Sequence, residues 1–240
     1  MKSLNVLIAL FFAMAVITPI AAESDAAVSY AEGSGFIIIS GGVRNSYDIA
    51  ADDVLGLPLN AGDTILTDDG SFVEVQMLTG DGGVIKVAEN TTLTITSMDR
   101  EGGSVLQVVY GRIRIKVNSI ISGSSLWVTG HDTVAGVRGT DFGYDLFYDR
   151  ADVGGERQTS VYVFDGEVDV YRYDSEVESK IELIDQVPLV LKSGKMVKSK
   201  SSAPTEKLKI TAINDEIREY WGLEPIMTDI GLPDPESLTV

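Results

Sequence analysis

The sequence reads Val-Thr-Gly-His-Asp-Thr-Val-Ala-Gly-Val-Arg-Gly-Thr-Asp-Phe at residues 128–142 and Thr-Ser-Val-Tyr-Val-Phe-Asp-Gly-Glu-Val-Asp-Val-Tyr at residues 159–171. Both stretches alternate apolar with polar residues and break at glycine, as half-buried strands joined by tight turns do. We therefore predict strands here whose inward-facing residues form a core, namely Val137, Phe142, Val161, Val163 and Val168.

The same pattern extends over most of the chain. Short alternating runs recur at intervals of about 8–12 residues, and each ends at Gly, Asp or Asn. They fall at 72–78, 83–87, 92–96, 105–109, 112–117, 126–128, 134–137, 142–147, 160–164, 167–172, 180–184, 189–191 and 196–197. Many short, evenly spaced strands indicate an all-β fold, with a sandwich, a barrel or a β-solenoid as the open alternatives.

Composition excludes several classes of function. The 240 residues carry a net charge of −17, which disfavours binding to nucleic acid or to anionic lipid, since both need clustered Lys and Arg. The sequence has no cysteine, so disulfides, thiolate catalysis, cysteine-ligated zinc and a lipid anchor on cysteine are excluded. We expect no cofactor and no metal.

The N-terminus resembles an export signal. Lys2 precedes an almost wholly apolar run at 4–17, and Pro19 with the pair Ala21 and Ala22 fits a cleavage region. An uncleaved anchor is the alternative, because 4–22 is near the minimum length of a membrane span. We predict a signal peptide at 1–22, no membrane span after its cleavage, and a periplasmic or secreted protein.

The rest of the chain divides by composition. Residues 23–35 are small and polar and predict a linker. We predict a β domain at 36–199, followed at 200–240 by a linker, an amphipathic helix and a tail. Residues 43–60 are less regular, and the neighbourhood of Asp52, Asp53 and Pro58 predicts a loop. The helix could begin near Thr205 or be capped by Thr211, and Gly222 and Pro225 are placed to end it. One face of it carries Ile210, Ile213, Ile217, Tyr220 and Trp221.

Several motifs of the β-rich part resemble the FecR-like domain, and they occur in that family's order. The most specific is Val-Arg-Gly-Thr-Asp-Phe at 137–142, followed by Val-Tyr-Val-Phe-Asp-Gly-Glu-Val at 161–168. Three earlier segments, at 61–75, 83–93 and 109–113, are similar to the family's preceding strands and to one of its turns. The resemblance covers 36–199, and the residues that carry it form a candidate structural signature: Gly62, Asp63, Val137, Arg138, Gly139, Thr140, Phe142 and Gly166.

The resemblance implies an extracytoplasmic β-solenoid-like domain of the kind found in envelope sensing. FecR proteins proper are periplasmic signal transducers that carry a cytoplasmic sigma-factor-regulating segment and a transmembrane helix before this domain. This sequence shows only a signal-like N-terminus, so we expect that the transmembrane mechanism does not carry over.

Single residues that could carry chemistry have structural alternatives. We predict that the guanidinium of Arg138 is partly buried and bonded to backbone carbonyls or to a carboxylate such as Asp141 or Asp165. A site for an anion is the alternative. His131 is the only histidine, so a two-histidine zinc site is excluded. A triad of His131 with Asp132 and a serine is conceivable, although we expect His131 in a turn.

Acidic and aromatic residues form the remaining candidates. Acidic pairs occur at 52–53, 68–69 and 149 with 152, and we interpret them as solvated loops, with calcium binding or glycosidase carboxylates as alternatives. Tyr162 and Phe164, like Tyr171 and Tyr173, share a strand face, where packing competes with stacking on sugars or peptides.

The sequence favours a non-enzymatic, extracytoplasmic binding or signalling module of the cell envelope. Its expected partner is a protein or envelope component. A structural scaffold of the envelope is the alternative, and a carbohydrate-active enzyme is the third.

Overall fold

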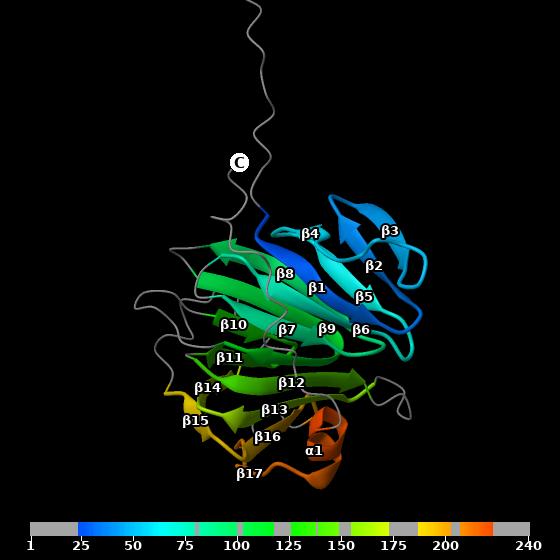
Figure 1. Cartoon of the computed structure of the whole chain (residues 1–240). Coiled ribbons are helices and arrows are strands. Elements are labelled where there is room, and N and C mark those ends of the chain that lie inside the picture. Colours follow the sequence, from blue (N-terminus) through cyan, green and yellow to red (C-terminus); the bar gives the residue numbers. More distant parts are fainter. Residues whose placement is uncertain are drawn as a thin grey trace, which may run out of the picture.

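The computed structural model describes residues 24–79, 82–99, 103–117, 126–137, 139–148, 155–172, 187–202 and 207–222, and these form two β-sheets and one short helix (Figure 1). Sheet A runs, in order of pairing, β4 (Pro58–Leu59), β1 (Ala26–Glu32), β6 (Phe72–Met77), β7 (Gly83–Val87), β9 (Gly103–Lys116), β12 (Asp141–Tyr148), β13 (Arg157–Asp165), β16 (Lys195–Lys200) and β17 (Thr211–Ala212).

Sheet B has a matching arrangement around the same central strand, because the long strand β9 pairs in both sheets. The first half of β9 pairs with β8 and β10 of sheet B, whereas its second half pairs with β7 and β12 of sheet A. Sheet B runs β3 (Val43–Asp48), β2 (Gly35–Ser40), β5 (Thr64–Thr67), β8 (Thr92–Asp99), β9, β10 (Leu126–Thr129), β11 (Thr133–Val137), β14 (Glu167–Arg172) and β15 (Leu189–Lys192).

One hydrophobic core lies between the two sheets. Val28, Ile85 and Ile115 of sheet A share a cluster with Ile65 and Leu106 of sheet B. The five residues predicted to form the core are all within it and are at most 1% exposed: Val137, Phe142, Val161, Val163 and Val168. Burying each such side chain contributes about 1.5–3 kcal/mol relative to leaving it in water, which is why strict alternation specifies these strands. The predicted all-β fold is confirmed.

The chain passes from one sheet to the other at the signature residues. Strand β11 ends at Val137 in sheet B and β12 begins at Asp141 in sheet A, and 165–167 lead back from β13 to β14. The two crossings lie against each other, since a Cβ added to Gly166 would meet Thr140 Cγ2 at 2.7 Å. Gly166 has φ +86°, which only glycine adopts without strain.

The same close packing of crossings occurs at Gly111. The family-like turn predicted at 109–113 is wrong, because β9 continues through these residues from sheet B to sheet A. Gly111 has φ +100°, and a Cβ there would meet the backbone and side chain of Thr91. Its missing side chain lets a single strand bend between two sheets, where the sequence pattern alone suggests two strands with a break.

Two boundaries predicted from composition are also wrong. Residues 26–32 of the expected linker at 23–35 form β1, whose pairing with β6 buries Ala26 and Val28. Residues 43–48, which the sequence shows only as less regular, form β3, an edge strand whose side chains are mostly exposed and therefore show no buried period. The expected linker at 200–240 begins within β16, which extends to Lys200. The strand predicted at 180–184 and the signal peptide at 1–22 lie outside the described residues.

Helix α1 (Asp215–Gly222) is shorter than the apolar pattern suggests. It begins after Asn214, whose side-chain oxygen accepts the amide N–H of Ile217 at 3.0 Å, so the helix does not begin near Thr205 and is not capped by Thr211. Ile210 and Ile213 precede the helix, and Ile213 is nevertheless buried. Figure 1 shows α1 beside β13 and β16.

A second, smaller hydrophobic cluster forms where α1 covers the outer face of sheet A. It joins Ile213, Ile217 and Trp221 to residues of three strands or their ends: Ala88, Tyr162 and Met196. Within the described part of the chain, no helix is long and apolar enough to cross a membrane.

Candidate functional site

The outer face of sheet A is lined by arginine and aromatic side chains. On β9, Ile113 and Ile115 are buried in the main core, so the alternating residues Arg112 and Arg114 point outward. β12 brings Asp145 directly opposite Arg112. We call the surface that Arg112, Arg114 and Asp145 form with the neighbouring aromatic residues the arginine–aromatic face; those aromatic residues are Phe147, Tyr162 and Phe164.

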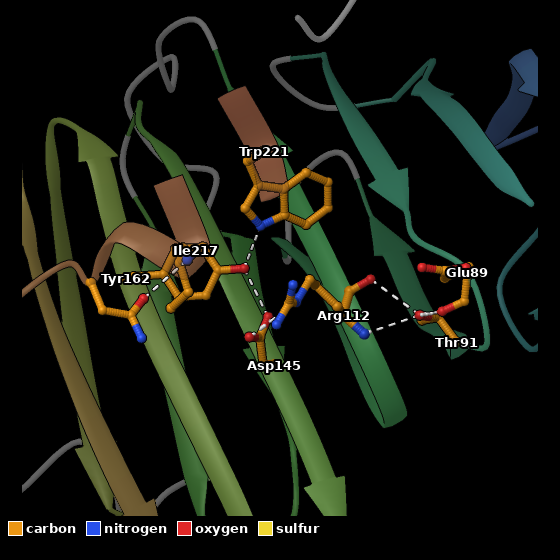
Figure 2. A network of polar contacts seen from close by, with 8 residues as sticks. Glu89, Thr91, Arg112, Asp145, Tyr162, Ile217 and Trp221 are labelled. Carbon is orange, nitrogen blue, oxygen red and sulfur yellow. Dashed lines mark hydrogen bonds and ion pairs between the residues drawn. The ribbon is translucent and has the colours of Figure 1, made fainter. Parts of the chain in front are cut away.

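A chain of hydrogen bonds links α1 to the centre of this face (Figure 2). The indole N–H of Trp221 donates to the hydroxyl of Tyr162 at 2.6 Å, and that hydroxyl donates to Asp145 Oδ1 at 2.7 Å. The second oxygen of Asp145 accepts Nε of Arg112 at 3.1 Å. Trp221, Tyr162 and Asp145 are 2%, 0% and 3% exposed, so these polar groups satisfy one another away from water.

Arg112 is held from three sides. Its guanidinium lies 4.1 Å from the ring centroid of Tyr220 in α1 and 5.5 Å from that of Phe147. Its backbone N–H donates to the hydroxyl of Thr91 at 3.0 Å. Arginine stacks on aromatic rings while keeping its hydrogen bonds, so one side chain joins a sheet to a helix.

Arg114 makes a second connection to the helix. It holds Asp141 in a two-pronged ion pair, with Nε to Oδ1 at 2.8 Å and Nη2 to Oδ2 at 2.7 Å. Its Nη1 donates to the backbone carbonyl of Trp221 at 3.3 Å, and its guanidinium lies 4.5 Å from the ring of Phe164. It therefore satisfies a carbonyl at the C-terminus of α1, where a cation is favoured.

Burial shifts the titration of the central groups. Desolvation raises the pKa of Asp145 from 3.8 to about 6, although Arg112 and the hydrogen bond from Tyr162 act to lower it. Burial also raises the pKa of the Tyr162 hydroxyl well above its ordinary value, and the nearby Asp145 adds to that effect. Burial raises the pKa of Tyr220 to about 12. The Tyr162 hydroxyl thus keeps its proton at neutral pH, whereas the pKa of Asp145 lies close to neutral pH.

The signature residues that the structure describes do not line this face. Gly62 and Asp63 shape the turn before β5, where Asp63 Oδ2 accepts the N–H of Asn60 at 2.8 Å. The others gather at the crossing between the sheets, so the structure assigns them a packing role: Val137, Gly139, Thr140, Phe142 and Gly166. Arg138 lies outside the described residues, and its structural role stays a prediction. Asp141, proposed above as its partner, is bound by Arg114.

Among the described residues, His131 and Asp132 do not form a catalytic triad with a serine. Asp132 is buried and accepts the hydroxyls of Thr133, Thr159 and Ser199 at 3.1, 2.7 and 2.5 Å. In a triad the serine bonds to the histidine rather than to the carboxylate. His131 contacts Arg157 instead, and burial, followed by Arg157, lowers the pKa of its imidazole.

The two acidic pairs that the structure describes form hydrogen bonds with neighbouring backbone or side-chain groups. Asp52 accepts the N–H of Asp48 at 2.8 Å, and Asp69 accepts the side-chain amide of Asn90 at 2.9 Å. Over the ranges that the structure describes, no cluster of three or more His, Asp or Glu is arranged to hold a metal ion. The pair 149 and 152 lies outside those ranges.

The tyrosines divide between packing and the site. Tyr162 meets Phe164 edge to face at 5.5 Å, and Tyr171 lies 5.8 Å from the ring of Trp127. Tyr173 lies outside the described residues. Sequence reasoning singled out Tyr162 as an aromatic residue for packing or stacking and Trp221 as part of an apolar helix face, but it missed Arg112, Arg114 and Asp145. The alternation Arg-Ile-Arg-Ile-Lys at 112–116 was the available signal, because it places every basic residue on one face.

One family model matches part of the chain. Residues 63–169 match the model of the family described as FecR protein, so the chain is similar to a FecR domain over these residues. The match confirms the resemblance seen in the motifs over these residues. Helix α1 lies beyond the C-terminal limit of the match, whereas Arg114, which it contacts, lies within the matched residues.

Two solved structures are similar to the chain. Both are crystal structures, at 1.65 and 2.50 Å, of a candidate anti-sigma factor from Parabacteroides distasonis ATCC 8503. Each is 16% identical in sequence, with TM-scores of 0.45 and 0.47. The matches cover 63% and 66% of this chain and 60% and 63% of the other, so the chain spans less than two thirds of their length. No curated protein matches the sequence.

Proposed function

We propose that this protein is a non-enzymatic signalling module that acts outside the cytoplasm and binds a protein of the cell envelope. The FecR domain supports a signalling role, since FecR-like domains are signalling modules. The charged head, apolar run and small residues at 1–22 support export to the periplasm or beyond it.

One observation carries the proposal, namely that α1 covers the arginine–aromatic face. Partly buried arginines and aromatics beneath a short helix are the residue types that dominate protein–protein hot spots. The face therefore has the chemistry of a binding site, and the chain's own helix is its occupant in this structure.

The engagement of the carboxylates supports a non-enzymatic role. Asp145 binds Arg112 and Tyr162, and Asp141 binds both prongs of Arg114. A glycosidase needs two carboxylates that face a substrate across a gap of about 5–9.5 Å. These two instead serve as structural acceptors.

A structural scaffold of the envelope is the second candidate. The edge strand β3 favours it, because it pairs only with β2 among the described strands and its Val43 is 61% exposed. Such edges can pair with the edge of another chain. Self-association that survives changes at the arginine–aromatic face would favour the scaffold.

The proposal is tested in cells that express the full-length chain. A photo-crosslinking residue, p-benzoylphenylalanine, replaces Phe147 on the arginine–aromatic face or, as a matched control, Leu55, which is 60% exposed and distant in the fold. We expect a discrete crosslinked envelope protein from position 147 alone. Equal crosslinking at both positions, or none, would count against a specific binding face.

Export is tested separately on the same cells. We expect fractionation to place the protein outside the cytoplasm, and N-terminal sequencing to read from Glu23. A mature chain that still begins at Met1 would contradict cleavage.

A further inference from the structure

We propose that the arginine–aromatic face accepts an acidic amphipathic helix from a partner protein, in competition with α1. This inference rests on the proposed function and names the partner's chemistry. It follows from the charge of the face, from the spacing of the residues that α1 inserts, and from the small size of α1 itself.

The face and the helix have opposite charge. Paired strands place six basic and four acidic side chains on the outer side of sheet A: Lys86, Arg112, Arg114, Lys116, Lys198 and Lys200, with Glu32, Glu74, Asp141 and Asp145. This positive surface stands out in a chain whose net charge is −17. α1 carries Asp215, Glu216 and Glu219 against the single cation Arg218, so the occupant seen here is acidic, and complementary charge favours another acidic one.

The contacts of α1 define an anchor pattern. Ile217, Tyr220 and Trp221 are spaced i, i+3 and i+4, which places them on one side of a helix. Ile217 and Trp221 are 3% and 2% exposed within the smaller cluster, and Tyr220 stacks on Arg112. A competing helix needs an apolar residue followed by an aromatic pair, with a last side chain that can donate to Tyr162.

Most of the contact is made by side chains of the face, which any such helix can use. Arg112 offers a flat cation, Arg114 offers a donor to a helix carbonyl, and Tyr162 offers an acceptor oxygen. None of these three interactions depends on covalent continuity with α1. The helix-in-groove mode of recognition works in this way, through a few anchors at helical spacing.

α1 is also small enough to be exchanged. It has eight residues, and an isolated helix of fewer than about 12 residues is marginal in water. The strand just before it, β17, pairs with β16 through only two residues, Thr211 and Ala212. A longer partner helix with the same anchors has more to gain from the face than α1 does.

The test uses a synthetic peptide with the sequence of residues 210–222, labelled at its N-terminus, and the full-length protein. Fluorescence anisotropy measures binding to wild-type protein and to Trp221→Ala, which vacates the site of the indole. We expect at least tenfold tighter binding of the peptide to Trp221→Ala, because the internal competitor is weakened. Val43→Ala is the matched control and should bind like wild type, since Val43 lies on the opposite edge of sheet B.

Two peptide variants test the chemistry. A peptide with Trp221→Ala should lose binding, and one with Asp215→Asn, Glu216→Gln and Glu219→Gln should bind several-fold more weakly at low salt and show little salt dependence. Circular dichroism and the melting temperature establish that each protein variant is folded. If Trp221→Ala does not fold, Ile217→Ala replaces it as the weakened competitor.

Every outcome bears on the inference. No peptide binding to a folded Trp221→Ala or Ile217→Ala protein would overturn it, as would equal binding of the charge-neutral peptide at low salt. A mixed dimer of wild type and Trp221→Ala in sedimentation would assign the face to a second copy of this chain instead. Peptide binding without any crosslinked partner at position 147 would contradict the proposed function but not this inference. A crosslinked partner without peptide binding would contradict the inference of an acidic helix but not the proposed function.

Discussion

The indole N–H of Trp221 donates to the hydroxyl of Tyr162 at 2.6 Å, across 59 residues of sequence. Because the same hydroxyl donates to Asp145, one tyrosine joins a helix outside the region that matches the FecR family to a strand within that region. The position of α1 therefore depends on a polar group that is fully buried, and changes to that group should be felt at the helix.

Tyr162→Phe should loosen α1 while keeping the ring. The change leaves the Trp221 N–H and one oxygen of Asp145 without partners, which costs about 1–3 kcal/mol for a buried group. In a Trp127→Phe background, Trp221 becomes the only tryptophan, and its emission should shift to longer wavelength as water reaches it. Tyr148→Phe is the matched control, because its hydroxyl donates to the exposed carbonyl of Val109; an equal loss of stability there would refute the special role of Tyr162.

Asp145 should give the protein an unusual dependence on pH. Its folded pKa of about 6 exceeds its ordinary 3.8, so the folded chain binds this proton more tightly than the unfolded chain. The resulting stability is fully present below about pH 4 and is lost as pH rises through about 6. The loss is at most about 3 kcal/mol, because one pKa unit corresponds to about 1.4 kcal/mol.

Urea unfolding of wild type and Asp145→Asn between pH 4 and pH 7 measures this effect by difference. The difference cancels the titration of the other carboxylates, because both proteins contain them. We expect the variant to gain stability relative to wild type as pH rises over this range. Parallel curves would show that Asp145 titrates at its ordinary pKa.

Gly166→Ala should destabilise the crossing between the sheets more than Gly62→Ala does. Both glycines have positive φ, +86° and +95°, so both changes incur backbone strain of about 1 kcal/mol. Only at Gly166 would the new Cβ meet other atoms, Thr140 Cγ2 at 2.7 Å among them. Thermal melts should therefore show a melting temperature for Gly166→Ala several degrees below that of Gly62→Ala; equal melting temperatures would mean that the crossings do not pack as described.

Arg114→Gln should cost about 2 kcal/mol of folding free energy, since it leaves a largely buried Asp141 without its two-pronged partner. Lys192→Gln removes an ion pair with Glu167 whose side chains are 69% and 59% exposed, and it should change stability by less than about 1 kcal/mol. Chemical denaturation of both variants checks the contrast. If the two losses are the same, the Arg114 pair behaves as a surface pair.

The alternating pattern was sufficient to predict the strands that have one buried face. Val161 and Val163 alternate with residues of the other face, so their burial could be read from the sequence. The same reasoning failed for β1, where small and polar residues pair with β6, and for β3, which has no buried face. Strands of these kinds are held by pairing with neighbours, which a local pattern does not record.

The candidate site was harder to predict for a related reason. The sequence showed that Arg112 and Arg114 share a face and that Ile217, Tyr220 and Trp221 share a helix side. It could not show that the two surfaces meet. The roles of Asp145 and Tyr162 follow only from that meeting, because burial by α1 is what makes their hydrogen bonds and the raised pKa of Asp145 matter.

By itself, the sequence determined the all-β class, the core positions and the FecR motifs, because alternation and glycine at crowded crossings are constraints that act within a few residues. Only the tertiary structure decided that β9 serves both sheets and that α1 closes over Arg112 and Arg114. Those features come from contacts between residues far apart in sequence, such as Trp221 and Tyr162, whose energy exists only once the chain has folded.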